Sequence, residues 1–320
     1  MTDSHASGYR GRIAPSPTGY LHLGHARTFW TAYERAKHGV LVLRVEDLDA
    51  SRCRPEFREA IAEDLRWFGI EWHEGPDVGG AFEPYVQSQR DYLPVWRSLR
   101  DAGMIYPCTC SRRDVMGSLS APHGDGPGDA QGEGDEPVYP GTCRHRLADA
   151  RGIGAPAGVN WRFRVPDGEG MRFQDGRAGE VRAVAGRDFG DFIVWRKDNI
   201  PSYQLAVVAD DAAMGITEVV RGEDLLRSTF RQILLYRALG FAEPAWYHCP
   251  LVRDAEGRRL AKRDAALSLR ELRRSGATPE TLSRPKNYRR GAETRRKGRE
   301  GPKGAVSLPR GPQPTCDGVD

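Results

Sequence analysis

The stretch that decides the fold is residues 11–25, which read GRIAPSPTGYLHLGH. Residues 11–14 predict a short buried strand, residues 15–19 a Pro/Gly turn, and residues 23–37 a helix with apolar side chains at helical spacing. Residues 40–45 are apolar apart from Arg44 and predict a second strand. Strands joined by a helical crossover pair in parallel. We therefore expect an α/β fold with a parallel sheet.

The same patterns predict further elements along the chain. Helices are expected at residues 56–68, 91–102, 229–239 and 269–274, and strands at residues 160–165, 192–196 and 204–208. Residues 123–137 are rich in glycine and contain no large apolar side chain, so we expect a mobile loop there. No periodic apolar pattern continues beyond Pro279, and we expect the folded part to end near residue 280.

Composition limits the class of protein. The 320 residues are 39% hydrophobic and include seven tryptophans, enough for a sizeable core. The sequence contains no run of about 18 apolar residues, and its N-terminus has no signal-like apolar stretch. Six cysteines are too few for a disulfide framework in a chain of this length. We expect a cytoplasmic globular protein with no membrane contact.

The charge is concentrated in one segment. The net charge is +4, but residues 284–303 carry nine Lys or Arg against two Glu, a local balance of +7, so the remainder is slightly acidic at −3. Such a segment can neutralise nucleic-acid phosphates, or it can simply remain solvated and disordered. Both interpretations stay open for this tail.

Two histidines stand where the turn gives way to the predicted helix. A helix N-terminus presents unpaired N–H groups and the positive end of the helix dipole to phosphates, and His22 and His25 can add donors there. Gly24 would let a base or ribose approach the backbone closely. The pattern suits ATP, although two histidines at this spacing can also be ordinary surface residues at a helix start.

The residues around the two histidines help to decide between an ATP site and an ordinary helix start. The segments RIAPSPTG (residues 12–19), HLGH (22–25) and RVEDLD (44–49) together resemble the opening of glutamyl-tRNA synthetases, which are class I aminoacyl-tRNA synthetases. In that family the APS residues after the arginine mark enzymes that use glutamate. The resemblance runs from about residue 11 to 264 and implies a Rossmann-like parallel sheet that activates glutamate with ATP and Mg²⁺.

The resemblance also implies an amino-acid site. Guanidinium groups suit a side-chain carboxylate, and a carboxylate suits an α-ammonium group. Without the family, Arg221 and the two acidic residues that follow Gly222 could be a salt-bridged turn. By resemblance, the glutamate site is lined by Arg12, Ile13, Ala14, Pro15, Ser16, Glu46, Tyr203 and Arg221.

A second ATP motif is expected downstream. The segment RLAKR resembles the lysine-containing loop usually written KMSKS, with arginine and alanine in place of its first lysine and first serine. The implied catalytic residues are His22, His25 and Lys262. The implied ATP-binding residues are His22, Gly24, His25, Arg259, Leu260, Ala261, Lys262 and Arg263.

Three cysteines and a tyrosine resemble the zinc site of the acceptor-binding insertion in these enzymes. The residues are Cys108, Cys110, Tyr139 and Cys143. Three thiolates and a phenolate would complete a tetrahedral structural Zn²⁺ site with no open position. His145 is an alternative fourth ligand, and free thiols or a redox pair remain open.

The expected domains are a flexible N-terminus (1–10), the first catalytic half (11–104), the zinc insertion (105–187), the second catalytic half (188–280) and a basic, disordered tail (281–320). Only 57 residues follow Arg263, whereas an anticodon-binding domain needs about 100 or more. We therefore expect no such domain, and the best family match is the glutamyl-Q tRNA(Asp) synthetases, which attach glutamate to queuosine in the anticodon loop of tRNA(Asp).

The expected partners are ATP, L-glutamate and queuosine-containing tRNA(Asp), bound by a monomer. Three alternatives stay open: a short glutamyl-tRNA synthetase that charges the 3′ end of tRNA(Glu), a different HxGH nucleotidyltransferase, and a noncatalytic RNA-binding derivative.

Replacing Lys262 by alanine tests the second motif. A cation that meets charge developing on the departing pyrophosphate is typically worth ~10²–10³ in rate. Lys262→Ala should slow glutamate-dependent ATP–pyrophosphate exchange by about this factor, and the zinc content of the same sample should stay unchanged. An unaffected exchange rate would show that the phosphate assignment is wrong.

Overall fold

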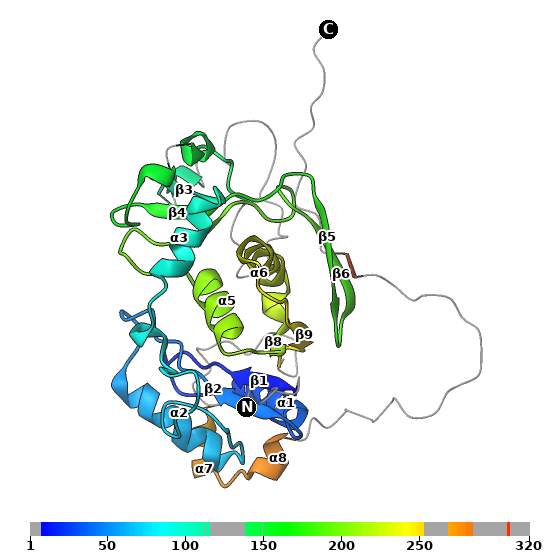
Figure 1. Cartoon of the computed structure of the whole chain (residues 1–320). Coiled ribbons are helices and arrows are strands. Elements are labelled where there is room, and N and C mark those ends of the chain that lie inside the picture. Colours follow the sequence, from blue (N-terminus) through cyan, green and yellow to red (C-terminus); the bar gives the residue numbers. More distant parts are fainter. Residues whose placement is uncertain are drawn as a thin grey trace, which may run out of the picture. The chain divides into compact units, whose positions relative to one another are not determined.

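The computed structural model describes residues 8–111, 113–115, 138–148, 150–252 and 268–283, and the backbone of residues 306–307. Contacts divide the chain into two units (Figure 1). Unit 1 comprises residues 1–90, 213–225 and 244–304, and unit 2 comprises residues 91–212, 226–243 and 305–320. The predictions for residues 1–7, for the loop 123–137, for the second ATP motif and for nearly all of the basic tail concern residues outside the described ones.

Unit 1 is built on the predicted βαβ element. Strand β1 (Arg10–Ile13) pairs in parallel with β2 (Val40–Leu43), and helix α1 (Leu23–Arg35) connects them. A second parallel pair, β8 (Glu218–Gly222) and β9 (Ala245–Cys249), joins them. The Thr217 amide donates to the Arg10 carbonyl at 2.9 Å, which places the start of β8 beside β1. The parallel α/β prediction is confirmed, whereas β8 and β9 were not predicted as strands.

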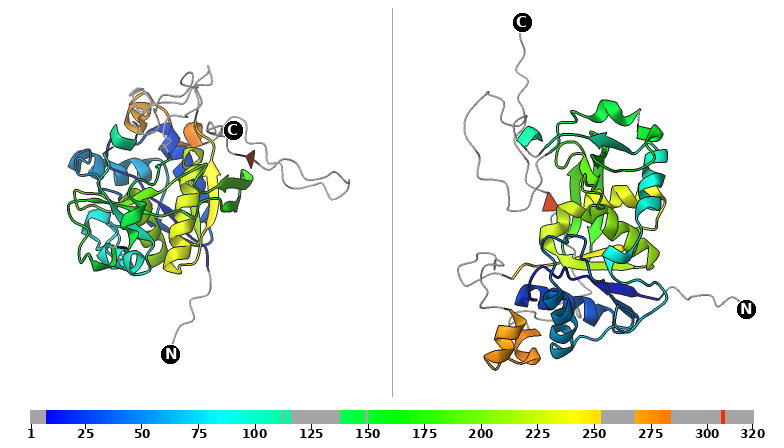
Figure 2. Two further views of the ribbon diagram at one scale, coloured as in Figure 1. Left: turned by 90° about the horizontal axis from the view of Figure 1, so that it is seen from above. Right: turned by 90° about the vertical axis from the view of Figure 1, so that its left-hand side faces the viewer.

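Helices cover one side of this strand group. They are α1, α2 (Pro55–Trp67), α7 (Leu269–Arg274) and α8 (Pro279–Ser283), and both views of Figure 2 show the orange α7–α8 segment next to the blue helices. Arg270 of α7 donates to Asp64 of α2 at 3.1 Å. Short 3₁₀ turns complete the described part of the unit at η1 (Gln87–Gln89) and η4 (Glu223–Leu225). The predicted α2 and α7 are thereby confirmed.

Successive strand residues alternate between two different environments in unit 1, as the two-residue period of a strand requires. One face carries the apolar core, with Ile13, Leu41, Leu43, Val220 and Cys249 packed with residues of α1 and α2. The alternate positions on the same strands place charged and polar side chains on the opposite face: Arg12, Arg44, Arg221 and His248. All four are buried.

Unit 2 contains a three-stranded antiparallel sheet in the order β3-β4-β7. These strands are β3 (Ile105–Cys108), β4 (Asn160–Phe163) and β7 (Phe192–Trp195). Helix α3 (Leu93–Asp101) packs Trp96 edge-on against Trp161 of β4, with ring centroids 4.8 Å apart. Residues near β3 form 3₁₀ turns at η2 (Arg144–Leu147) and η3 (Ala150–Gly152).

The other described elements of unit 2 include a hairpin and two helices. The hairpin joins β5 (Gly170–Asp175) to β6 (Gly179–Val184), and the backbone of β10 (Val306–Ser307) pairs with β6. The helices are α5 (Tyr203–Ala213) and α6 (Leu226–Leu239). No helix in the described part of the chain is long and apolar enough to cross a membrane.

One predicted strand is wrong. Residues 204–208 lie in helix α5, not in a strand. Leu205 to Asp211 are all buried, so this helix lacks a polar face in that stretch. Periodicity cannot distinguish a fully buried helix from a buried strand. Conversely, β5 alternates strictly between exposed and buried residues, a strand signal that was overlooked.

A buried carboxylate joins the strands and turns of unit 2. Asp191 is 3% exposed and accepts hydrogen bonds from the Val165 amide at 2.9 Å and from Arg144 at 2.6 Å. The Tyr106 hydroxyl also donates to it, and burial together with this bond raises the pKa of Tyr106 above its ordinary range. Asp191 thus holds together residues of β3, η2 and the β4–β5 connection.

Removing this carboxylate should destabilise the protein. Asp191→Ala leaves Arg144 and several buried donors without their acceptor, so the free energy of unfolding should fall by about 3–5 kcal/mol in urea titrations. Asp198→Ala is the control, because Asp198 forms an exposed ion pair with Arg196 and should cost less than about 1 kcal/mol. Equal losses in the two variants would contradict the role given to Asp191.

Candidate functional site

The start of α1 is organised by His22. This residue is the N-cap of the helix, and its Nδ1 accepts hydrogen bonds from the Gly24 amide at 3.1 Å and the His25 amide at 3.4 Å. The rings of His22 and His25 stack with centroids 3.7 Å apart. A neutral histidine whose Nδ1 accepts carries its proton on Nε2, which can therefore donate to a phosphate oxygen. The sequence indicated the two histidines but not this capping role.

Gly24 lies directly against the capping ring. A Cβ atom at this position would be 2.9 Å from Cε1 and 3.0 Å from Nδ1 of His22. Glycine at this position therefore leaves room for the capping conformation of His22.

The described residues on both sides of the second ATP motif are attached to unit 1. On the N-terminal side, the Leu251 amide donates to Glu223 at 3.1 Å. On the C-terminal side, the Leu269 amide donates to the Leu21 carbonyl at 2.8 Å, and Ser268 forms a β-bridge with His22. Residues 259–263 themselves lie outside the described residues. The roles predicted for Arg259, Leu260, Ala261, Lys262 and Arg263 therefore remain predictions.

Two arginines of the predicted glutamate site lie on neighbouring strands. Arg12 of β1 is 4% exposed and donates to the Val220 carbonyl at 3.1 Å. Arg221 follows Val220 on β8, is 5% exposed, and donates from Nε to Nε2 of His248 at 3.1 Å. The structure thus places two buried guanidinium groups on one face of the unit 1 strands.

The remaining unit 1 residues of that predicted site lie at the ends of β1 and β2. The Glu46 amide donates to the Pro15 carbonyl at 3.0 Å, so Glu46 lies beside the turn that follows Ile13 and Ala14 and contains Ser16. The Glu46 carboxylate accepts from Arg44 at 2.9 Å in a buried ion pair. The ion pair with Arg44 holds the Glu46 carboxylate in the same region as the arginines.

Tyr203 belongs to the other unit. It is the first residue of α5 and is 38% exposed. Its contribution to the glutamate site remains a prediction.

Arg44 and His248 contact residues of the predicted glutamate site but were not themselves predicted. Arg44 is the single charged residue in an otherwise apolar segment, and this signal could have indicated that it pairs with the predicted Glu46. His248 carried no comparable signal, because β9 was not recognised as a strand.

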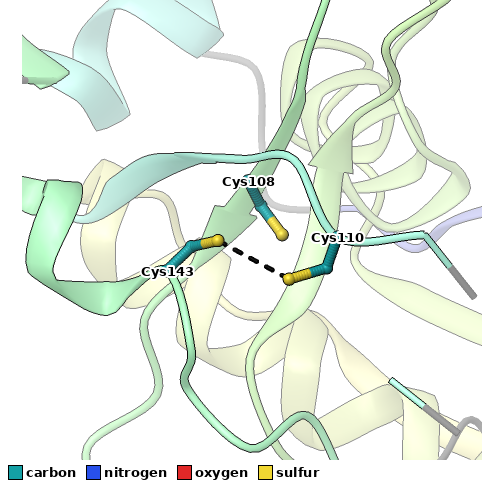
Figure 3. A group of neighbouring side chains, drawn as sticks. All are labelled: Cys108, Cys110 and Cys143. Carbon is teal, nitrogen blue, oxygen red and sulfur yellow. Dashed lines mark hydrogen bonds between the residues drawn. The ribbon is translucent and has the colours of Figure 1, made fainter. Parts of the chain in front are cut away.

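Unit 2 brings the predicted metal ligands together (Figure 3). The Sγ atoms of Cys108, Cys110 and Cys143 lie within 4.8 Å of one another, and those of Cys110 and Cys143 are 3.6 Å apart. The Tyr139 hydroxyl lies 3.4 Å from the Cys108 sulfur and 3.3 Å from the Cys110 sulfur. None of the cysteines among the described residues forms a disulfide.

These spacings fit a tetrahedral ion. With Zn–S bonds of about 2.3 Å, two thiolates on one zinc lie about 3.8 Å apart, and a phenolate oxygen lies about 3.5 Å from each sulfur. The cluster approaches this geometry with all four predicted ligands. His145 is instead exposed, and its Nδ1 lies 3.1 Å from the Thr142 carbonyl oxygen, outside the thiol group.

One thiol of the cluster is shifted toward its anionic form, whereas burial raises the pKa of a second thiol, Cys110, and of the Tyr139 hydroxyl. Burial alone would raise the pKa of the Cys143 thiol, but hydrogen bonds with Tyr139, the Thr109 backbone and the other two cysteines lower it to about 6. The Cys143 amide donates to the Tyr139 oxygen at 3.0 Å. Buried Arg162 donates to the Cys108 sulfur at 3.4 Å and lies over the Tyr139 ring. Thiolate is the form that binds a metal.

Parallel strands joined by a helix whose start carries two stacked histidines define a Rossmann-like nucleotide-binding α/β protein. The family model for the catalytic domain of class I tRNA synthetases (E and Q) matches residues 9–298. The chain belongs to this family.

Relatives refine the comparison. The chain is 48% identical over 278 residues to the glutamyl-Q tRNA(Asp) synthetase of Symbiobacterium thermophilum, covering 85% of this chain and 83% of that protein. It is 47% identical over 273 residues to the protein of the same name from Nitratidesulfovibrio vulgaris, with 83% and 82% covered. It is 40% identical to a glutamate–tRNA ligase of a Sulfurihydrogenibium species, where 85% of this chain aligns with only 56% of that protein.

Solved structures agree with the family. The glutamate–tRNA synthetase of Elizabethkingia anophelis superposes with a TM-score of 0.65 at 28% identity, covering 81% of this chain and 53% of that one. The glutamate–tRNA ligase of Elizabethkingia meningosepticum, solved in complex with its amino acid, gives a TM-score of 0.63 at 28% identity, with 81% and 52% covered. The chain spans about half the length of these two structures.

Gly24→Ala tests the arrangement at the start of α1. Alanine normally stabilises a helix relative to glycine by about 1 kcal/mol. Here its Cβ would displace the His22 ring and remove the N-cap, whose contribution to helix stability is also about 1 kcal/mol. The melting temperature should therefore change little, while ATP affinity measured by calorimetry should fall by about 10-fold. Gly154→Ala, which meets nothing within 4 Å, is the control. An unchanged ATP affinity in Gly24→Ala would contradict this role.

Proposed function

We propose that the chain is a ligase that activates L-glutamate with ATP and transfers it to the queuosine base of tRNA(Asp). The choice of acceptor rests on a difference in sequence similarity between two groups of relatives. Three relatives named glutamyl-Q tRNA(Asp) synthetase are 44–48% identical and are covered over 82–83% of their length. Five named glutamate–tRNA ligase are 39–43% identical and are covered over 55–56%.

Activation needs no nucleophile from the protein. The glutamate α-carboxylate attacks the α-phosphate of ATP in line, forming glutamyl-adenylate and releasing pyrophosphate. The Nε2–H of His22, the helix N-terminus, His25 and Lys262 stabilise the charge that develops on the phosphates. Mg²⁺ bound with ATP would neutralise charge on the phosphate oxygens.

Glutamate is selected by charge on the buried polar face of unit 1. The guanidinium groups of Arg12 and Arg221 bind its carboxylates, and the Glu46 carboxylate binds its α-ammonium. Residues 13–16 form the backbone turn beside Glu46. The contribution of Tyr203 rests on the family resemblance alone. A neutral side chain at the same place could not form charge-assisted hydrogen bonds of the same strength with these guanidinium groups.

Transfer is an acyl substitution. A hydroxyl of the queuosine cyclopentene-diol attacks the carbonyl carbon of glutamyl-adenylate. The bond between this carbon and the phosphate oxygen breaks, AMP leaves, and the proton of the hydroxyl is released. Positioning supplies most of the acceleration. ATP, glutamate and tRNA are all present in the cytoplasm, and we place the reaction there. We expect the protein to act as a monomer.

The alternatives differ in what supports them. A short glutamyl-tRNA synthetase would share the glutamate site, and the lower identity to glutamate–tRNA ligases disfavours it. A noncatalytic RNA-binding derivative has no need for the buried Arg12 and Arg221 or for the ordered His22 cap.

We further propose that Cys108, Cys110, Tyr139 and Cys143 bind a structural Zn²⁺. The near-tetrahedral spacing of the donors and the donation from Arg162 support this assignment. Four protein ligands leave no open position, so the ion would hold β3 and the residues before η2 together and would take no part in the reaction.

The fourth ligand is tested by two substitutions. Tyr139→Phe keeps the ring and removes the oxygen, and should weaken zinc binding by at least about 10-fold in competition with a chromophoric chelator. His145→Ala should bind zinc like the unchanged protein. The reverse pattern would assign His145 as the ligand, and a protein that binds no zinc would exclude the site.

The acceptor is tested with four RNAs. Radiolabelled glutamate should enter tRNA(Asp) that carries queuosine, and should still enter it when the 3′-terminal adenosine lacks both ribose hydroxyls. Unmodified tRNA(Asp) and tRNA(Glu) should stay uncharged. Charging of unmodified tRNA(Asp) equal to that of the modified form, or charging that disappears with the 3′ hydroxyls, would overturn the proposed acceptor.

A further inference from the structure

His248 is the direct register partner of Arg221. Strands β8 and β9 pair in parallel with Arg221 opposite His248 and Val219 opposite Trp246. Because strand side chains alternate, Trp246 and His248 both lie on the face of β9 that Arg221 occupies on β8. Arg221 is 5% exposed and His248 is 0% exposed. The sheet itself therefore places a histidine beside the predicted carboxylate-binding arginine.

The hydrogen bond between them fixes the state of the histidine. Arg221 donates from Nε to Nε2 of His248 at 3.1 Å. A guanidinium group has only donors, so Nε2 must accept, and the ring is neutral with its proton on Nδ1. The Arg221 guanidinium carbon also lies 5.0 Å from the centroid of the Trp246 ring. One edge and one face of the guanidinium group are therefore in contact with β9.

We propose that His248 is a positioning residue that sets the plane of the Arg221 guanidinium group for binding a glutamate carboxylate. This inference rests on the proposed function, because it takes Arg221 as part of the glutamate site. A planar fork recognises a carboxylate only in the correct orientation. A bond to Nε restrains rotation about the end of the arginine side chain, so less order has to be imposed when glutamate binds.

The proposal separates binding from catalysis. His248 acts through Arg221 on the amino acid, so its loss should raise the KM for glutamate and leave the KM for ATP and kcat nearly unchanged. A purely structural role would instead reduce the fraction of folded enzyme, lowering apparent kcat without changing either KM.

Two substitutions of His248 distinguish the effect of its hydrogen-bond acceptor from the effect of its side-chain volume. His248→Leu removes the acceptor and should raise the glutamate KM in ATP–pyrophosphate exchange by about 10-fold or more, the effect expected for a lost hydrogen bond to a charged group. His248→Gln retains a side-chain oxygen that can accept from Arg221 Nε, and should recover most of the affinity.

Cys249→Ala is the matched control. Cys249 follows His248 on β9 but is buried in the apolar core on the other face, so its substitution should affect stability without changing the glutamate KM. Circular dichroism and thermal melting report the folded fraction of each variant. If His248→Leu does not fold, the comparison of His248→Gln with a further variant, His248→Ala, provides the same contrast.

The outcomes separate this inference from the proposed function. Unchanged glutamate KM in folded His248→Leu or His248→Ala, with normal exchange in the parent protein, would overturn the positioning role alone. A parent protein without glutamate-dependent exchange would overturn the proposed function. A glutamate KM that is raised in His248→Leu and mostly restored in His248→Gln would establish His248 as the residue that orients Arg221.

Discussion

The two-residue alternation of side chains across the parallel strands of unit 1 is the constraint on which its site depends. Ile13, Leu43 and Val220 point into the apolar core with α1 and α2, and the intervening positions carry Arg12 and Arg221 on the opposite face. Apolar burial on one face therefore holds buried cations in place on the other. Burying such cations is unfavourable unless acceptors compensate them, and here Arg12 donates to the Val220 carbonyl and Arg221 to His248.

The nucleotide end of unit 1 depends on a different interaction, the capping of α1 by His22. The cap orders the first turn of the helix and determines which ring nitrogen carries the proton. Gly24 permits that ring position, and the contact of Leu269 with Leu21 attaches α7 to the same turn. The residues proposed to bind phosphate and the described residues next to the predicted second ATP motif are thus organised by a few contacts that are close in space.

Unit 2 has its own polar centres. Asp191 connects Tyr106 and Arg144, and Arg144 directly follows Cys143 in the thiol cluster. Arg162 links the two centres, because it donates both to the Cys108 sulfur and to the Asp191 carbonyl. Order around the cluster is therefore coupled to the β3-β4-β7 sheet, and metal binding would stabilise a region already held by buried charge pairs.

The sequence by itself determined what lies within short stretches: the βαβ element, the two histidines at a helix start, the segments that resemble glutamyl-tRNA synthetases, and the cysteines predicted to cluster. Such features depend on local periodicity and motif spacing. Only the tertiary structure decided that residues 204–208 are helical, that Tyr139 and not His145 lies beside the thiols, and that His248 accepts from Arg221, 27 positions distant. These contacts arise from strand register and complete burial, which join segments whose local patterns are independent of each other.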